Sequence, residues 1–263
     1  MNVIRIYGGL GNQLFQYAFG RAQEENGIEV AYEDSWYHRN MDKKYPRPYI
    51  LGKFQTHVKF SPFLNQPKIK QSKDKRYHME LLKKINVNFD GYWQFLPYFK
   101  HILPILRKEF MVKSEFYTPQ YLQIKQEIEE SNSVSVHVRR GDYLTHKGLF
   151  RNLKFQYYYT ALKGVVGDLF IFSDDIAWCK ELFTSEYFSN KITFVDIADY
   201  LSFELMRTCK EHIISNSTYS YWAAVLSGNP TKCPQHWLGN AEIDTKELQY
   251  PKGWTKIEDY VVY

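Results

Sequence analysis

Apolar strands alternate with helices along the second half of this 263-residue chain, and the connections between them are short. The expected strands are 134–138, 168–173, 191–195 and 211–215, and a helix near 155–163 lies between the first two. Strands that alternate with helices form parallel sheets, because a crossover must return the chain to the same edge before the next strand begins. The sequence therefore predicts a doubly wound α/β domain in this half.

The strand at 134–138 delivers an unusual set of residues at its carboxyl end. His137 lies within it, and Arg139, Arg140, Gly141 and Asp142 follow directly. In open α/β sheets ligands bind outside the carboxyl ends of the strands, and a planar guanidinium suits a two-pronged contact with a phosphate. A solvated charge pair followed by a glycine turn is the plainer explanation. The residues at the other strand ends are needed to decide between a phosphate-binding site and a solvated charge pair.

Two further strand ends carry polar residues. Asp174 and Asp175 follow 168–173, and such a pair suits a metal ion, a helix cap or an acceptor for ribose hydroxyls and base N–H groups; we favour the acceptor role. Asn216, Ser217 and Thr218 precede a helix expected at 219–226. Small polar residues at a helix start are common caps, and together with the helix N–H groups they also bind phosphate.

The chain opens with a strand, a glycine turn and a helix. Residues 3–7 form the expected strand, Gly9 and Gly11 lie in the turn, and Asn12 is the predicted N-cap of a helix that ends at 26–27. The turn is not a dinucleotide fingerprint, because leucine stands where its third glycine belongs, and no Gly-Lys-Ser/Thr follows for a P-loop. We expect the turn to bring the backbone close to a ligand.

The middle of the chain is less regular. A second strand is expected at 28–32, an irregular stretch at 41–78, a strand or turn at 88–94, and helices at 96–110 and 120–130. The polar Ser-Asn-Ser at 131–133 is the predicted domain boundary. The first domain would then span 1–131, rejoined by 238–263, and the second domain would span 132–237.

Composition limits the classes of function. The net charge of +5 is too small to indicate nucleic acid, and the 17% aromatic residues, including 22 Tyr, supply flat faces for sugars or bases. Three separated cysteines indicate a reducing compartment, and no apolar run is long enough to span a membrane. We expect a cytoplasmic protein without a transmembrane segment. The Lys/Arg-rich stretch 68–84 is either a solvated face or a weak contact with anionic lipid.

Six motifs in order resemble the α-1,2-fucosyltransferases of glycosyltransferase family 11, in their bacterial form. They are GGLGNQLFQYA at 8–18, GYWQ at 91–94, HVRRGDY at 137–143, FIFSDD at 170–175, IISNSTYSYW at 213–222 and GWTKI at 253–257. The similarity covers nearly the whole chain. One departure concerns donor recognition: Ser202 stands where the family pattern has Asp, and Glu204 or Asp199 would have to substitute.

The resemblance implies a GT-B-like α/β fold with two Rossmann-like halves facing across a cleft. It implies transfer of L-fucose from GDP-fucose, with inversion, to the 2-hydroxyl of a terminal galactoside on an oligosaccharide or lipid-linked glycan. The second half would hold GDP-fucose, and the first would receive the acceptor. It further implies no cofactor and no obligatory metal. A lipid-linked acceptor would bring the enzyme to the inner face of the membrane.

The expected site residues divide by role. Arg139 is the expected catalytic cation, because it can stabilise the charge that develops on the leaving GDP. Asp142 is the first candidate for the base, with Asn12 as its positioning partner, although Asp142 could instead brace Arg140 or cap the next helix. The expected donor contacts are His137, Arg139, Arg140, Asp174, Asp175, Glu204, Asn216, Ser217 and Thr218. The expected acceptor-side residues are Gly9, Gly11, Asn12 and Gln13.

Two other functions stay open at this point. One is a GDP-sugar transferase with another acceptor or linkage. The other is a non-catalytic sugar-binding protein, for which an adjacent arginine pair at a strand end would be unnecessary.

Overall fold

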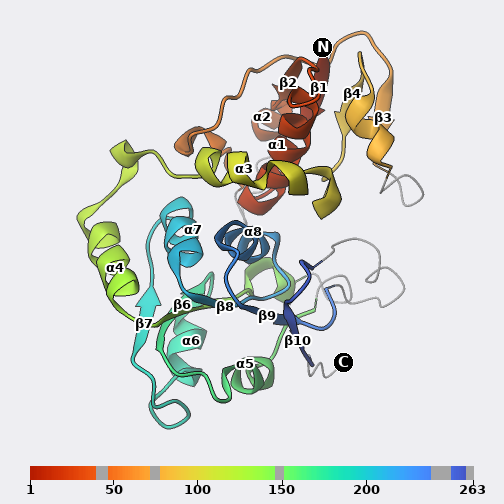
Figure 1. The fold of residues 1–263 in the computed structure, drawn as a ribbon. Coiled ribbons are helices and arrows are strands. Elements are labelled where there is room, and N and C mark those ends of the chain that lie inside the picture. Colours follow the sequence, from red (N-terminus) through yellow and green to blue (C-terminus); the bar gives the residue numbers. More distant parts are fainter. Residues whose placement is uncertain (40–46, 72–77, 146–150, 238–249, 259–263) are drawn as a thin grey trace. The chain divides into compact units, whose positions relative to one another are not determined.

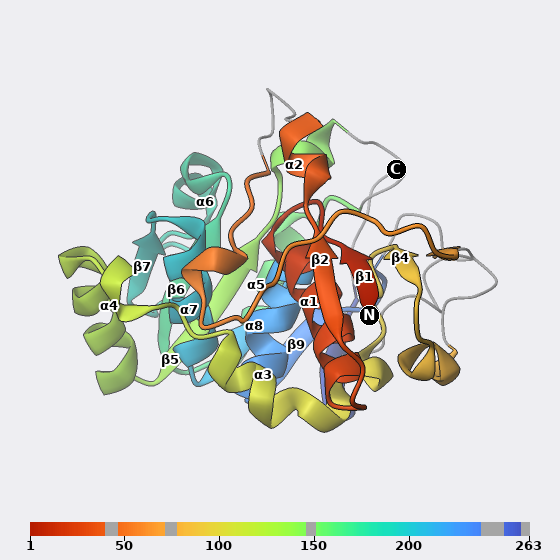
Figure 2. The same cartoon turned by 90° about the horizontal axis from the view of Figure 1, so that it is seen from above.

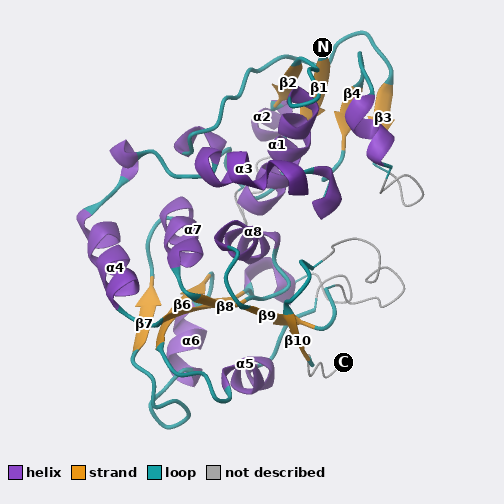
Figure 3. Cartoon of the chain, viewed as in Figure 1, coloured by secondary structure: helices purple, strands orange, loops and turns teal. Residues whose placement is uncertain are grey.

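The structure is a computed structural model that describes residues 1–39, 47–71, 78–145, 151–237 and 250–258. Its backbone divides into two compact units, the first comprising Met1–Lys113 and the second beginning at Ser114. Each unit is built on its own parallel sheet (Figure 3). The α/β fold class predicted from the sequence is confirmed.

The first unit contains a four-stranded sheet in the order β2-β1-β4-β3. Its strands are β1 (Asn2–Arg5), β2 (Val30–Glu33), β3 (Lys68–Lys70) and β4 (Asn88–Asp90), and all pair in parallel. Helix α1 (Leu10–Glu24) packs on β1 and β2. Apolar side chains fill this interface, and the ring of Phe19 on α1 stacks on Trp93 with centroids 4.7 Å apart.

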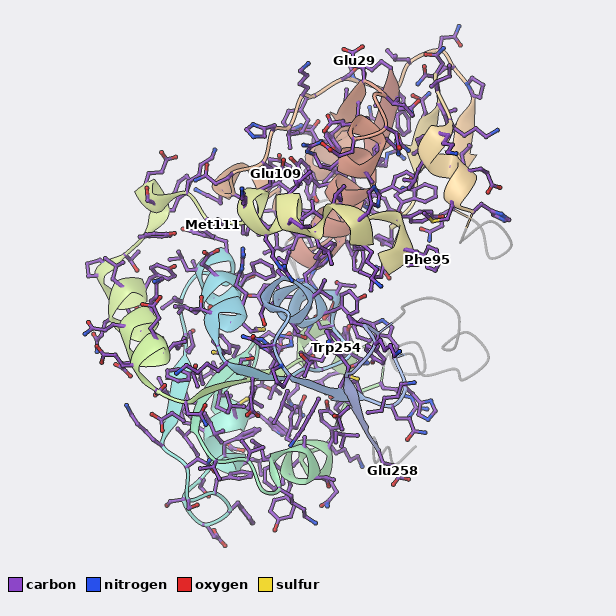
Figure 4. The ribbon with its side chains drawn as sticks, viewed as in Figure 1. Glu29, Phe95, Glu109, Met111, Trp254 and Glu258 are labelled. Atoms are coloured by element: carbon purple, nitrogen blue, oxygen red, sulfur yellow. The ribbon has the colours of Figure 1, made fainter. Side chains whose placement is uncertain are left out.

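Short helices complete the first unit. They are α2 (Ser35–Arg39), η1 (Leu51–Lys53), η2 (Met79–Lys83), η3 (Leu96–Tyr98), η4 (Lys100–Ile102) and α3 (Leu103–Glu109). The single helix predicted at 96–110 is wrong, because Pro97 and Pro104 each start a new short helix instead of continuing one. Glu109, labelled in Figure 4, fixes α3 to α1 by accepting hydrogen bonds from Tyr17 and Arg21, each 2.9 Å long.

The second unit contains a six-stranded sheet in the order β10-β9-β8-β5-β6-β7. Its strands are β5 (Ser133–Val138), β6 (Asp168–Ser173), β7 (Ile192–Val195), β8 (Glu211–Ile213), β9 (Thr231–Pro234) and β10 (Thr255–Ile257). All pair in parallel, and β5 to β8 lie within two residues of the predicted strands. The chain starts at β5, moves outward to β7, and returns to β8 on the other side of β5. The strand order therefore reverses between β5 and β8.

Helices cover both faces of this second sheet (Figure 1). One face carries α5 (Phe155–Leu162) and α6 (Ile176–Leu182), and the other carries α7 (Asp199–Thr208) and α8 (Thr218–Ser227). β5 is buried along its whole length, as expected for the centre of a doubly wound sheet. Tyr157, Tyr158 and Phe183 pack with β5 and β6 in one apolar core.

The boundary between the units differs from the prediction at residue 131. Helix α4 (Pro119–Glu130) packs against α7, as Figures 1 and 2 show, and so belongs to the second unit. The sequence also predicted that residues 238–263 rejoin the first domain. The described part of this segment does not, because β10 pairs with β9 in the second sheet. The polar Ser-Asn-Ser segment at 131–133, which was the predicted domain boundary, is therefore only the connection between α4 and β5.

No helix in the described part of the chain is long and apolar enough to cross a membrane. Part of the basic stretch 68–84 lies outside the described residues, because 72–77 are not described. Within the rest, Lys68 forms an ion pair with Asp90 at 2.7 Å.

Candidate functional site

The carboxyl ends of β5, β6 and β8 bring the predicted site residues of the second unit together. In the parallel register Val138 lies opposite Ser173, so the residues that follow, Arg139 and Asp174, become neighbours. On the other side Val136 lies opposite Ile213, and the chain continues from there into residues 215–218. This edge is the point where the strand order reverses, which is where open α/β sheets bind ligands.

Arg139 lies between two carboxylates. Its Nη2 donates to Asp142 Oδ1 at 2.6 Å, and its Nη1 lies 3.0 Å from Asp174 Oδ2. The guanidinium also lies over the ring of Tyr143, with its central carbon 5.5 Å from the ring centroid. Burial disfavours the charged form, but the carboxylates of Asp174 and Asp142 outweigh it and raise the pKa of Arg139. Arg139 therefore stays charged, and its orientation is fixed from two sides.

Arg140 is held by the same pair of aspartates that follows β6. Its backbone N–H donates to Asp174 Oδ1 and its Nε donates to Asp175 Oδ2, both at 2.9 Å. The guanidinium stacks over Trp178 on α6, 4.2 Å from the ring centroid. Asp175 is also the N-cap of α6, since its Oδ1 accepts from the Trp178 N–H at 3.2 Å. Both aspartates thus serve the arginine pair.

Gly141 makes the close approach of these two strand ends feasible. A Cβ at this position would collide with Asp174 Oδ2. Any larger residue would push Asp174 away from Arg139, so the glycine is needed for packing and not for its φ angle. Among the described residues no cluster of three or more His, Cys, Asp or Glu side chains is placed to hold a metal ion.

His137 is a buried link between β5 and the segment after β8. Its Nδ1 is 2.8 Å from Ser215 Oγ, and its ring lies against Tyr219, with centroids 5.4 Å apart. Burial, with a smaller effect from the charge on Arg139, lowers the pKa of His137 to about 3. His137 is therefore neutral at physiological pH. Its contacts in the structure position residues 215–219, so the direct nucleotide contact predicted from the sequence stays a prediction.

Residues 216–218 form the entrance to α8. Asn216 Nδ2 donates to the carbonyls of Arg151 and Trp237, both at 3.0 Å, and Tyr143 Oη donates to the Asn216 carbonyl at 2.9 Å. Ser217 is the N-cap in extended conformation, and within the described residues its hydroxyl makes no capping bond. Thr218 begins the helix. The first N–H groups of α8 and two hydroxyls can therefore meet an anion.

Among the described residues, the ion pair of Glu204 is with Arg207 and not with Arg139 or Arg140. Glu204 is buried on α7, its Oε2 lies 3.9 Å from Arg207 Nη1, and its charge acts on Tyr121 of α4. Ser202, for which the resemblance led us to expect an aspartate, is buried too, and its Oγ donates to the Ile197 carbonyl at 3.2 Å. A role for Glu204 in base recognition thus stays a prediction.

The predicted acceptor-side residues lie in the glycine loop of the first unit and in the first turn of α1. Gly9, not Asn12, is the N-cap of α1, so Gly11 and Asn12 lie in the first turn; the predicted capping role of Asn12 is wrong. Asn12 Oδ1 instead accepts from Gln94 Nε2 at 2.9 Å. The side chain of Gln13 ties the loop together, donating to the carbonyls of Gly8 (3.1 Å) and Pro48 (2.8 Å) and accepting from the Ile50 N–H (2.9 Å).

The strand ends of the second unit can bind an anionic, polar ligand. A guanidinium of fixed orientation, the start of a ten-residue helix and two hydroxyls lie at one sheet edge. The sequence predicted Arg139 and the α8 start, but it missed that Asp174 orients Arg139 and that Trp178 covers Arg140. The register of β5 against β6 would have revealed the contact between Asp174 and Arg139, but this register depends on tertiary structure.

Comparison with known proteins decides the family. Residues 68–258 match the sequence profile described as Glycosyl transferase family 11. The Alpha-1,2-colitosyltransferase of Escherichia coli is 31% identical over 295 aligned positions, which cover 97% of this chain and 98% of the relative. The chain belongs to glycosyltransferase family 11. It is therefore a glycosyltransferase, and the sheet edge built around Arg139 is its candidate donor site.

A more distant sequence relative and a solved structure give two further comparisons. The Galactoside 2-alpha-L-fucosyltransferase Sec1 of Mus musculus is 26% identical over 262 positions, covering 88% of this chain and 66% of the relative. Among solved structures, the fucosyltransferase NodZ from Bradyrhizobium matches with a TM-score of 0.52 at 12% identity, covering 86% of this chain and 92% of NodZ. NodZ is GT-B-like, and this likeness supports the GT-B-like fold class.

Proposed function

We propose that this enzyme transfers L-fucose from GDP-fucose to the 2-hydroxyl of a terminal galactoside, with inversion at the fucose anomeric carbon. The galactoside would end an oligosaccharide or a lipid-linked glycan. The observation that carries the proposal is the oriented guanidinium of Arg139 at the point where the second sheet reverses its strand order. Family membership and the α-1,2 linkage named for the colitosyl and fucosyl relatives support it.

The diphosphate of the donor would lie between Arg139 and the start of α8. As the bond between fucose and phosphate breaks, negative charge develops on the GDP β-phosphate. Asp142 accepts from one of the five N–H groups of the Arg139 guanidinium and Asp174 forms an ion pair with it, so other N–H groups can turn to the phosphate oxygens. The N–H groups of α8 and the hydroxyls of Ser217 and Thr218 would bind the same anion. A preoriented cation of this kind favours the transition state over the ground state.

In this proposal no metal ion and no cofactor takes part. Arg139 and the α8 N-terminus stabilise the leaving group in place of a divalent cation. Asp174 and Asp175, which the sequence also allowed as metal ligands, are used as acceptors by the arginine pair.

Asp142 fits a bracing role better than the role of catalytic base. Its Oδ1 accepts a 2.6 Å hydrogen bond from Arg139 Nη2, so the carboxylate is already engaged by the guanidinium. Transfer of a proton from the acceptor hydroxyl to Asp142 would neutralise the carboxylate that pairs with Arg139. We therefore assign Asp142 to the orientation of Arg139, and the base stays unassigned.

A second donor is favoured by a specific observation, the 31% identity to an Alpha-1,2-colitosyltransferase over almost the full length of both chains. Colitose is L-fucose without its 3-hydroxyl. The two donors would share the diphosphate contacts and differ at one hydroxyl, so the Arg139 site serves either one. A site that hydrogen-bonds this hydroxyl discriminates strongly against the sugar that lacks it.

The test is incubation of the purified enzyme with GDP-fucose or GDP-colitose and a panel of β-galactosides, followed by NMR determination of the new linkage. The proposal predicts an α-1,2 linkage to galactose, with GDP-fucose preferred. Formation of another linkage, use of another acceptor or a preference for GDP-colitose would overturn the proposed linkage, acceptor or donor respectively. Binding of GDP without turnover of any acceptor would favour a sugar-binding protein.

A further inference from the structure

An aromatic cluster lies at the carboxyl edge of the sheet in the first unit. Tyr7 follows β1 and Tyr92 follows β4, and their ring centroids are 4.6 Å apart. Trp36, which follows β2, lies 6.3 Å from Tyr7. The strand order β2-β1-β4-β3 reverses between β1 and β4, so Tyr7 and Tyr92 occupy the reversal point of this sheet. Ligands of open α/β sheets bind at such points.

The backbone beside Tyr92 forms a strained turn. Trp93 has a φ of +56°, a conformation that bulky residues rarely adopt. The Gln71 side chain holds this turn, because its Oε1 accepts from the N–H groups of Tyr92 and Trp93 at 2.6 and 3.0 Å. The turn sends Trp93 into the core and leaves Tyr92 39% exposed.

Amide groups border the aromatic rings. Gln94 follows two residues after Tyr92, and its Nε2 donates to Asn12 Oδ1 at 2.9 Å. Both side chains are partly exposed. Flat aromatic faces flanked by a few amide donors and acceptors suit a pyranose ring, whose C–H face is apolar and whose hydroxyls need partners.

The surrounding charges favour a neutral ligand. At the ends of β1, β2 and β4, Arg5 pairs with Glu33 at 2.6 Å and with Asp90 at 3.0 Å. Burial raises the pKa of Tyr7 and that of Tyr92, so both phenols stay protonated at neutral pH. This edge therefore contrasts with that of the second unit, where two guanidiniums lie beside the N-terminus of α8.

We propose that Tyr7, Trp36 and Tyr92 form the platform on which the acceptor sugar, a terminal β-galactoside, stacks, with Gln94 and Asn12 bonding its hydroxyls. The inference rests on the proposed function for the identity of the sugar. The contacts that define the platform lie within the first unit.

The test uses saturation-transfer NMR on the full-length enzyme with lactose and no donor. Saturation should reach lactose through the galactose ring, and Tyr92→Ala should weaken lactose binding about tenfold. Tyr92→Phe keeps the ring and should bind nearly as wild type does. Tyr187→Ala, which removes an exposed aromatic ring of the second unit, is the matched control. Unchanged melting temperatures identify the variants that are folded, and GDP binding should be equal in all of them.

The outcomes separate this inference from the proposed function. Equal lactose binding by folded Tyr92→Ala and wild type would overturn the platform. Absence of binding for lactose and for every other glycoside of a neutral panel would overturn it too. If another glycoside binds and loses affinity in Tyr92→Ala, the platform stands and the galactoside acceptor of the proposed function fails.

Discussion

Arg139 is surrounded by more negative than positive charge before any ligand binds. The carboxylates of Asp142 and Asp174 contact Arg139, and Asp175 pairs with the adjacent Arg140. Such pairing reduces the attraction for an incoming diphosphate, but it fixes the guanidinium in one orientation. Preorganisation of this kind lowers the reorganisation that the transition state requires. At the residue scale, the site therefore depends on the aspartates as much as on the arginines.

Asp174 should act as a positioning residue, and Asp174→Asn tests this. Asparagine can still accept from the Arg140 N–H, but it loses the charge that pairs with Arg139 Nη1. We expect kcat to fall about tenfold, equivalent to about 1.4 kcal/mol, with a smaller change in the KM for the sugar nucleotide. Steady-state kinetics measure both constants.

The control for Asp174→Asn is Asp168→Asn. Asp168 begins the same strand at its opposite end. The control should keep wild-type kinetics. A kcat for Asp174→Asn within twofold of wild type would show that Asp174 does not position Arg139.

At the scale of elements, two buried histidines connect β5, β8 and α8. His137 bonds to Ser215, and His212 bridges Ser135 at 2.7 Å and Ser227, on α8, at 2.6 Å. Burial lowers the pKa of each imidazole to about 3. The His137 link holds the start of α8 at the carboxyl edge of the sheet, where the proposal places the diphosphate, and the His212 link holds the other end of α8.

Acid should therefore destabilise the protein. Between pH 6.5 and the folded pKa of about 3, an unfolded histidine binds a proton that the folded one excludes. The free energy of unfolding should fall with decreasing pH, by up to about 1.4 kcal/mol per pH unit for each histidine. Urea unfolding at pH 7.5, 6 and 5 measures this slope.

His212→Gln should make this pH dependence shallower, whatever its effect on stability at pH 7.5, because one titrating group is gone. His38→Gln, which changes an exposed imidazole, is the control and should keep the wild-type slope. An unchanged slope in His212→Gln would mean that burial of His212 does not contribute to acid sensitivity.

The sequence predicted regular elements well where the local pattern was strong. β6 has the predicted bounds, and β5 and α5 differ from prediction by a residue, since continuous apolar runs and helical periodicity define them locally. The strands β9 and β10 were missed because short, partly polar segments become strands only by pairing with neighbours. The same limit applied to the site: Arg139 was found from its own motif, but its pairing with Asp174 depends on strand register.

At the scale of the whole molecule, the enzyme should work without a divalent metal ion. The proposal gives the stabilisation of the leaving group to Arg139 and to the N-terminus of α8. Dialysis against EDTA should therefore leave the transfer rate within about twofold of its starting value. Complete loss of activity in EDTA, restored by Mg²⁺ or Mn²⁺, would contradict the metal-independent mechanism and give Asp174 and Asp175 a role as ligands.

The central claim is that Arg139 stabilises the departing GDP, and single-turnover kinetics of Arg139→Ala and Arg139→Lys test it most directly. Loss of an oriented group that stabilises transition-state charge typically costs about 10²–10³ in rate. We predict a loss of this size for Arg139→Ala, and an intermediate loss for Arg139→Lys, which keeps the charge but not the two-pronged geometry. A folded Arg139→Ala enzyme that transfers the sugar at a near-normal rate would contradict the account.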